Sequence, residues 1–128
     1  MRFQHINLAV RDPEVSANFY KTYLMPGAET VWLGASLHLR DARGSDMAFQ
    51  AAAATGDIIK PEAHGAHHGF LAASAAEIDS LAARLTAEGV DLVEDDTEAG
   101  FRAIKFADPD GYVCEVYWEG NWPPDADS

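Results

Sequence analysis

The chain has 128 residues, 48% of them hydrophobic and 23% charged, and its formal net charge is -12. This composition fits one compact globular domain or two small fused modules, and it excludes a disordered chain, which would contain fewer aromatic and branched residues. The acidic charge argues against binding to nucleic acid or to an anionic membrane surface, because both require basic patches.

The first half of the chain predicts the element order β-α-β-β-β. Alternation of apolar and polar residues predicts a strand over 3–10. Asp12-Pro13 is typical of a helix start, with Asp12 as the N-cap and Pro13 at the first helical position, and Pro26-Gly27 ends the helix. Three strands are then expected, over 29–33, 35–40 and 46–51.

The same order restarts after a linker. A strand is expected over 67–72, and Ser74 with Glu77 has the spacing of a capping box at the start of a helix that Gly89 ends. Three further strands are expected, over 90–93, 101–106 and 112–118. The acidic stretch Glu94–Glu98 between them reads as a solvated loop, and Asp108–Gly111 reads as a turn.

The two halves therefore repeat each other. His5-Ile6-Asn7-Leu8-Ala9-Val10 opens the first, and His67-His68-Gly69-Phe70-Leu71-Ala72 opens the second 62 positions later. We predict an α+β fold of two tandem βαβββ modules in a single domain, with module one at 1–52, a linker at 53–66, module two at 67–118 and a tail at 119–128.

The repeat pairs two strand histidines. His68, Phe70 and Ala72 align with Ile6, Leu8 and Val10, the residues expected to pack under the helix. This alignment places His67 in register with His5, on the opposite, concave face. His68 is the alternative to His67, because a slip of one residue exchanges the faces of the two side chains.

Glu115 lies in the middle of an otherwise apolar strand, on the face of Val113 and Tyr117. A buried carboxylate requires a cation, and the sequence offers no obvious lysine or arginine fixed opposite it. Two imidazoles and one carboxylate on a shared concave surface would form a metal site with open positions. Such a site suits Fe(II), Mn(II), Zn(II), Ni(II) or Co(II).

Three other residues with reactive side chains are not assigned to the metal site. His38 could line the pocket, but its neighbours Leu37 and Leu39 do not fix the face that it takes. His64 lies in the linker, where we expect it to be solvated. Cys114 alternates away from the pocket and reads as a small core residue. As the single cysteine, it also excludes an intramolecular disulfide.

The chain resembles the vicinal oxygen chelate superfamily, which includes glyoxalase I, fosfomycin-resistance proteins, extradiol dioxygenases and bleomycin-resistance proteins. The resemblance covers Phe3 to Trp118. It rests on the segments His5–Pro13, Asn18-Phe19-Tyr20 and Phe106–Val116. It implies a curved mixed sheet around a central cavity that holds a divalent metal, with the helices on the convex side.

Carried over residue by residue, the resemblance gives His5 from the first module and His67 and Glu115 from the second as metal ligands. Aligning Asp46–Gln50 on Val113–Tyr117 places Ala48 opposite Glu115. Alanine cannot ligate a metal, so the fourth ligand of glyoxalase I is missing. Three ligands resemble the fosfomycin-resistance enzymes and the dioxygenases better.

The resemblance also implies a reaction class. We expect a glyoxalase-like, divalent-metal-dependent enzyme of lyase, isomerase, transferase or dioxygenase type, acting on a small molecule that chelates the metal through two oxygens. Glu115 or a metal-bound water would be the catalytic base. The substrate pocket would be shaped by Phe3, Asn7, Gln50 and Tyr117.

Two other readings stay open. One is a bleomycin-resistance-like protein that binds a cationic drug without metal or catalysis, and the other is a scaffold or regulator that uses only the fold. The resemblance implies a homodimer, whose metal site is complete within one chain or shared between two. The N-terminus lacks a signal-peptide pattern and no apolar run approaches ~20 residues, so we expect a cytoplasmic protein.

Overall fold

A computed structural model describes residues 1–55 and 66–124 of the chain, which divides into two compact units, Met1–Pro61 and Glu62–Ser128. The division falls within the linker expected over 53–66. Most of that linker, the expected solvation of His64 and the last four residues of the tail lie outside the described residues.

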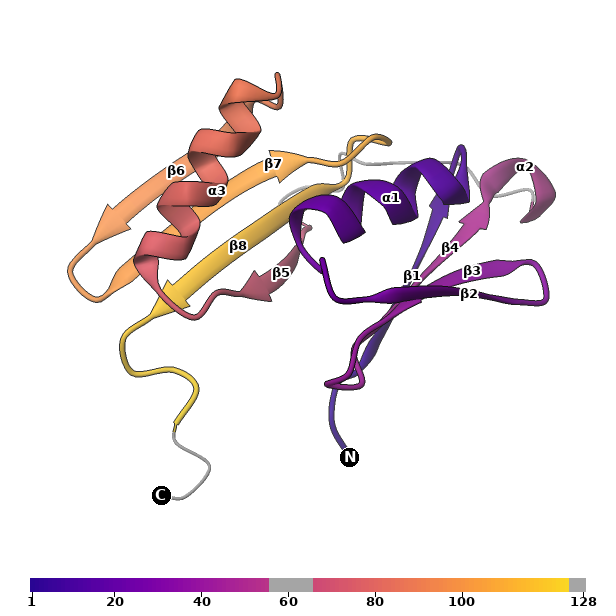
Figure 1. The fold of residues 1–128 in the computed structure, drawn as a ribbon, viewed down its shortest axis with the longest axis horizontal. Helices are drawn as coiled ribbons and strands as arrows, with labels where there is room; N and C mark the ends of the chain where they lie inside the picture. The colour runs from indigo at the N-terminus through magenta and orange to yellow at the C-terminus, as the bar shows by residue number, and fades with distance from the viewer. Residues whose placement is uncertain (56–65, 125–128) are drawn as a thin grey trace. The chain divides into compact units, whose positions relative to one another are not determined.

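The first unit is a four-stranded sheet with one long helix against it (Figure 1). Strand β1 pairs in parallel with β4, and β4, β3 and β2 pair antiparallel, in the order β1-β4-β3-β2. Helix α1 packs on β3 and β4, where the rings of Tyr20 and Phe49 lie 5.4 Å apart. The elements are β1 (His5–Val10), α1 (Pro13–Tyr23), β2 (Glu29–Leu33), β3 (Ser36–Arg40), β4 (Asp46–Ala51) and the short α2 (Ala52–Thr55).

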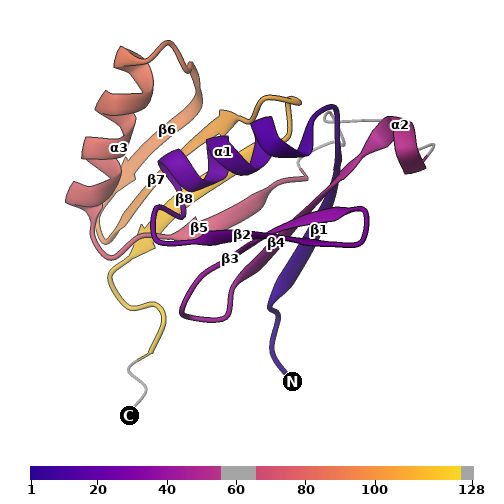
Figure 2. The same ribbon diagram turned by 45° about the vertical axis from the view of Figure 1, so that its right-hand side comes forward.

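The second unit repeats this plan, with the strand order β5-β8-β7-β6 and a parallel pair formed by β5 and β8 (Figure 2). Helix α3 packs on β6, β7 and β8. The core of the second unit contains Ile78 and Leu85 from the helix and Ile104 and Phe106 from β7. The elements are β5 (His68–Leu71), α3 (Ala75–Ala87), β6 (Leu92–Glu98), β7 (Phe101–Ala107) and β8 (Val113–Glu119).

The predicted α+β class and the two tandem βαβββ modules are confirmed. The two long helices, α1 and α3, begin at the residues that the capping patterns predict. The Asp12 carboxylate accepts from the backbone N–H of Glu14 at 3.0 Å. The Ser74 hydroxyl accepts from the N–H of Glu77 at 3.2 Å, and the Glu77 carboxylate accepts from the N–H of Ala73 at 2.8 Å.

The repeat extends to the turns that lead into the last strand of each unit. The Asp41 carboxylate accepts from the N–H of Arg43 and of Ser45, both at 3.0 Å, and Gly44 has a φ of +86°. The same arrangement recurs at Asp108, which accepts from two backbone N–H groups at 2.9 Å, with Gly111 at a φ of +92°. A side chain is strained at such a φ, so glycine suits both positions.

The acidic stretch Glu94–Glu98 was expected to be a loop, and this expectation is wrong: it forms most of β6. Its side chains are exposed, as expected for charged residues. Cross-strand ion pairs with β7 offset the low strand propensity of acidic residues. Lys105 Nζ lies 2.9 Å from Glu94, and Arg102 Nη1 lies 2.6 Å from Asp95.

Arg102 is a buried cation of the second unit, with only 6% of its surface exposed. Its guanidinium donates to Asp79 of α3 at 2.9 Å, to Asp95 of β6 at 2.6 Å and to the carbonyls of Asp96 and Ala103. One side chain thus ties the helix to two strands. Burial lowers the pKa of Arg102, but the two carboxylates outweigh it and leave the pKa above its ordinary value.

We expect Arg102→Ala to lower the free energy of unfolding by about 2–3 kcal/mol, because it leaves a cavity and two carbonyls without this donor. Arg84→Ala is the matched control. Its ion pair with Glu88 is exposed on both sides, and its loss should cost less than about 0.5 kcal/mol. Urea denaturation of both variants measures the free energies of unfolding. Equal losses in the two variants would contradict the conclusion that Arg102 holds α3 against the sheet.

Candidate metal centre

The face of the first sheet that points away from α1 carries polar side chains. Because strand registers place cross-strand partners side by side, His5, Asp46 and Arg40 form one row across β1, β4 and β3. The next row along the strands contains Asn7, Ala48 and His38, and the third contains Ala9, Gln50 and Ser36.

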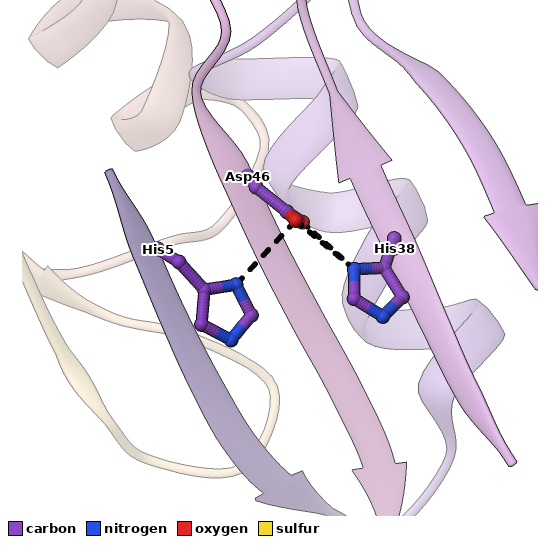
Figure 3. Close-up of side chains that lie close together, drawn as sticks. All are labelled: His5, His38 and Asp46. Atoms are coloured by element: carbon purple, nitrogen blue, oxygen red, sulfur yellow. Dashed lines mark hydrogen bonds and ion pairs between the residues drawn. The ribbon is translucent and has the colours of Figure 1, made fainter. Parts of the chain in front are cut away.

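The carboxylate of Asp46 is the centre of this face. It accepts from His38 Nδ1 at 2.9 Å and from Arg40 Nε at 3.2 Å, and it lies 3.5 Å from His5 Nδ1. The two imidazole rings are stacked, with centroids 5.9 Å apart and planes inclined by 22°. Figure 3 shows that each ring turns Nδ1 toward Asp46 and its other nitrogen away from it.

Asp46 is ionised at neutral pH. Its burial raises the pKa, but the hydrogen bonds and charges of His38 and Arg40 outweigh this effect and hold the pKa below its ordinary 3.8. An ionised carboxylate only accepts hydrogen bonds, so the proton of the His38 ring lies on Nδ1. The Nε2 lone pair of His38 is then directed away from the carboxylate, in the orientation that metal-binding histidines take.

The second unit places His67 and Glu115 together. His67 Nε2 lies 3.7 Å from Glu115 Oε1, with the two side chains 33% and 21% exposed. His68 lies on the other face, where its Nε2 is 3.6 Å from the Cys114 sulfur. The face that the alignment assigned to His67 is therefore the face it has, while its role as a metal ligand stays a prediction.

Glu115 has a cation across from it that the sequence did not reveal. Lys105 of β7 is its direct register partner, and Glu94 of β6 follows in the same row. The Glu94 hydrogen bond raises the pKa of Lys105, and the charge of Glu115 adds to this effect. On the β5 side the row contains Gly69, where a Cβ would lie only 3.3 Å from the Tyr117 ring and 3.8 Å from Glu115 Oε1. Glycine thus leaves room for both side chains.

The remaining predicted pocket residues divide between the units. Asn7 Nδ2 donates to Gln50 Oε1 at 3.5 Å, and Gln50 Nε2 donates to the Ser36 hydroxyl at 2.7 Å. Phe3 precedes β1 and is 89% exposed. Tyr117 lies against Gly69 in the second unit. The combination of His5 with His67 and Glu115 joins the two units and stays a prediction.

Sequence reasoning missed Asp46 and did not fix the face of His38. The signal was present in β3, where Leu37 and Leu39 are both buried against the helix side. Alternation then places His38 on the polar face, in the row of Ala48. Asp46 gave no signal beyond its place at the start of a strand, because its partners come from two other strands.

A groove of about 450 Å³ opens in the first unit and shares Arg40 with the cluster around Asp46. None of the predicted site residues lines it, so we place no chemistry there. Its lining residues are Gly27, Glu29, Thr30, Val31, Arg40, Asp41 and Ala42.

Comparison with known proteins identifies a family. The model of the Glyoxalase/Bleomycin resistance protein/Dioxygenase superfamily matches residues 2–116. No curated protein sequence matches the chain. Among the residues that the structure describes, no helix is both long and apolar enough to cross a membrane.

Several solved structures share the fold. A possible glyoxalase from Bacillus cereus is 24% identical, with a TM-score of 0.72 over 91% of this chain and 97% of that one. The fosfomycin resistance protein FosX from Listeria monocytogenes is 23% identical, with a TM-score of 0.72 over 91% and 92%. A lactoylglutathione lyase from Agrobacterium tumefaciens is 19% identical, with a TM-score of 0.71 over 95% and 96%.

The buried His68 generates a pH prediction. Burial, with a smaller contribution from the charge of His67, lowers the pKa of His68 to about 4 from an ordinary 6.5. Between these values the unfolded chain binds a proton that the native protein does not, so stability should fall as the pH falls from 7 to 4. At ~1.36 kcal/mol per pKa unit, the loss is on the order of 3 kcal/mol.

The measurement is urea denaturation of the wild type and of His68→Gln across this pH range. The variant lacks the titrating ring, so its stability should depend less steeply on pH, and the difference between the two proteins should shrink toward pH 4. Parallel pH profiles would contradict the prediction. An NMR titration of the His68 ring in the wild type measures the pKa directly.

Proposed function

Because this chain belongs to the Glyoxalase/Bleomycin resistance protein/Dioxygenase superfamily, we propose that it is a divalent-metal-dependent enzyme acting on a small substrate that chelates the metal through two oxygens. The observation that carries the proposal is the pair formed by His67 and Glu115, whose Nε2 and Oε1 lie 3.7 Å apart on one face of the second sheet. His5 occupies the equivalent position of the first unit.

The donor set fits a divalent metal. Two neutral imidazoles and one carboxylate suit Fe(II), Mn(II), Zn(II), Ni(II) or Co(II), and leave coordination positions for a substrate. His5 has the support that such a ligand needs, because its Nδ1 lies 3.5 Å from the ionised Asp46 and its Nε2 faces away from the carboxylate (Figure 3). We propose His5, His67 and Glu115 as the ligands.

The remaining roles follow from the chemistry of the side chains. When bound, the metal would polarise the chelating oxygens of the substrate and stabilise the negative charge that develops on them. Glu115 has two carboxylate oxygens, so one can ligate while the other accepts a proton from the substrate. Asn7 and Gln50, which are joined by a hydrogen bond, present fixed amide groups that can orient a polar substrate. Phe3 and Tyr117 would supply apolar contacts.

The register of β4 and β8 supports a choice among the reaction types of the family. Ala48 pairs with Asn7 as Glu115 pairs with Gly69, so Ala48 holds the position equivalent to Glu115. A first unit without a carboxylate there argues against a lactoylglutathione lyase in the strict sense. We therefore favour chemistry of the fosfomycin-resistance or dioxygenase type, in a cytoplasmic homodimer that binds no nucleic acid and no membrane.

The test is metal binding by the full chain, measured by isothermal titration after removal of bound metal. We expect at least one of Fe(II), Mn(II), Zn(II), Ni(II) and Co(II) to bind with a stoichiometry of one. Loss of a direct ligand in His67→Gln or Glu115→Gln should weaken binding by about 100-fold or more, beyond the roughly 10–100-fold effect of an outer-shell change.

Glu119→Gln is the matched control, because it removes an exposed carboxylate from the same strand and should leave the affinity unchanged. If none of the five metals binds, the proposal fails. Thermal stabilisation by bleomycin in that case would support the drug-binding alternative instead.

A further inference from the structure

We infer that His38 is a further metal-binding residue, which takes the place in the first unit of the carboxylate missing at Ala48. The inference rests on the proposed metal site and adds a ligand to it. We assign Asp46 as the positioning residue that holds the rings of His38 and His5.

The strand registers show where a carboxylate of the second unit is replaced by an imidazole in the first. In the second unit, Glu115 on the last strand lies across from Lys105 on the preceding strand. In the first unit, the equivalent positions are Ala48 and His38. The second unit thus has a carboxylate and a cation where the first has a methyl group and an imidazole. A ligand lost from one strand is replaced by one on its neighbour.

The packing allows His38 to fill this position. Direct cross-strand partners have Cβ atoms about 4.5–5.5 Å apart, and alanine has no atoms beyond Cβ to compete for the space between them. The His38 ring stacks against His5, the first-unit ligand, with centroids 5.9 Å apart. The two rings come from β3 and β1, the strands on either side of β4.

Asp46 determines which nitrogen each ring offers. One carboxylate, 7% exposed, receives His38 Nδ1 at 2.9 Å and has His5 Nδ1 at 3.5 Å (Figure 3). Arg40 also donates to it, at 3.2 Å. With its oxygens occupied in this way, Asp46 acts on the rings rather than as a ligand, and each ring turns Nε2 away from it. A ring nitrogen of each histidine and a carboxylate oxygen of Asp46 lie within 4.8 Å of one another, so the two rings converge on this carboxylate.

The experiment titrates Zn²⁺ into the full chain and into three variants. His38→Gln should weaken Zn²⁺ binding by about 100-fold or more, because it removes a direct ligand, and Asp46→Asn should weaken it by roughly 10–100-fold, as an outer-shell change does. Val31→Ala is the matched control. It shortens a side chain in the row of His38 without removing a donor, and should bind as the wild type does.

A second measurement observes the histidine rings directly, first in the wild type. Long-range 1H–15N NMR of the wild-type histidines shows which ring nitrogen carries the proton, and Zn²⁺ should shift the Nε2 signals of both His5 and His38. In Asp46→Ala, which removes the acceptor side chain, the His38 ring should lose its preference for the Nδ1-protonated tautomer. A merely structural role of Asp46 would leave this tautomer unchanged, and that result would overturn the positioning assignment.

The outcomes separate this inference from the proposed function. If Zn²⁺ binds and needs Glu115, but His38→Gln binds normally and the His38 signals do not move, the inference is overturned and the proposed function stands. If Zn²⁺ binding needs His38 and His5 but not His67 or Glu115, the inference stands and the proposed ligand set fails. If the wild type binds none of the five metals, both fail.

Discussion

The parallel pairing of the first and last strand in each unit is the constraint on which the candidate site depends. It fixes which side chains share a face, because a shift of one residue would exchange the polar and apolar sides of a strand. The pairing of His5 with Asp46 and of His68 with Cys114 sets every cross-strand row of side chains in the two sheets. The aspartate and glycine turns that precede β4 and β8 begin both strands in the same way, which keeps the registers of the two units alike.

Although the two units share a strand register, only the first has a buried aspartate, Asp46, at the start of its last strand. The residue that aligns with it in the second unit is Val113, whose side chain neither ionises nor accepts a hydrogen bond. The first unit therefore carries an ionised carboxylate that fixes two rings, whereas the second carries Glu115 nearer the middle of its last strand, opposite Lys105. A duplicated fold has thus kept its backbone and distributed its charged groups in two different ways.

The sequence predicted most of the fold, because the signals for it are local. Caps, glycine turns and alternation each depend on residues a few positions apart, and they located the two long helices, α1 and α3, and nearly every strand; the short α2 was not predicted. The strand expected over 90–93 was too short, and the acidic part of β6 was missed because its ion-pair partners, Lys105 and Arg102, lie on another strand. The grouping of His38 with Asp46 was missed for the same reason. The face of His67 could be predicted, because the repeat supplied a second copy of the strand for comparison.

The difference between Ala48 and Glu115 at equivalent positions suggests how a site of this fold can exchange one metal ligand for another. A four-ligand centre built from two equivalent units would take a ligand from both equivalent positions, and here one of these is Ala48, which cannot ligate. Losing that side chain from β4 leaves the backbone register intact, so the neighbouring strand can supply a donor without any change in the fold. An imidazole in place of a carboxylate also removes one negative charge from the set of donors. A bound divalent ion would then keep more of its positive charge to polarise a substrate oxygen, which suits the activation of neutral or weakly acidic groups.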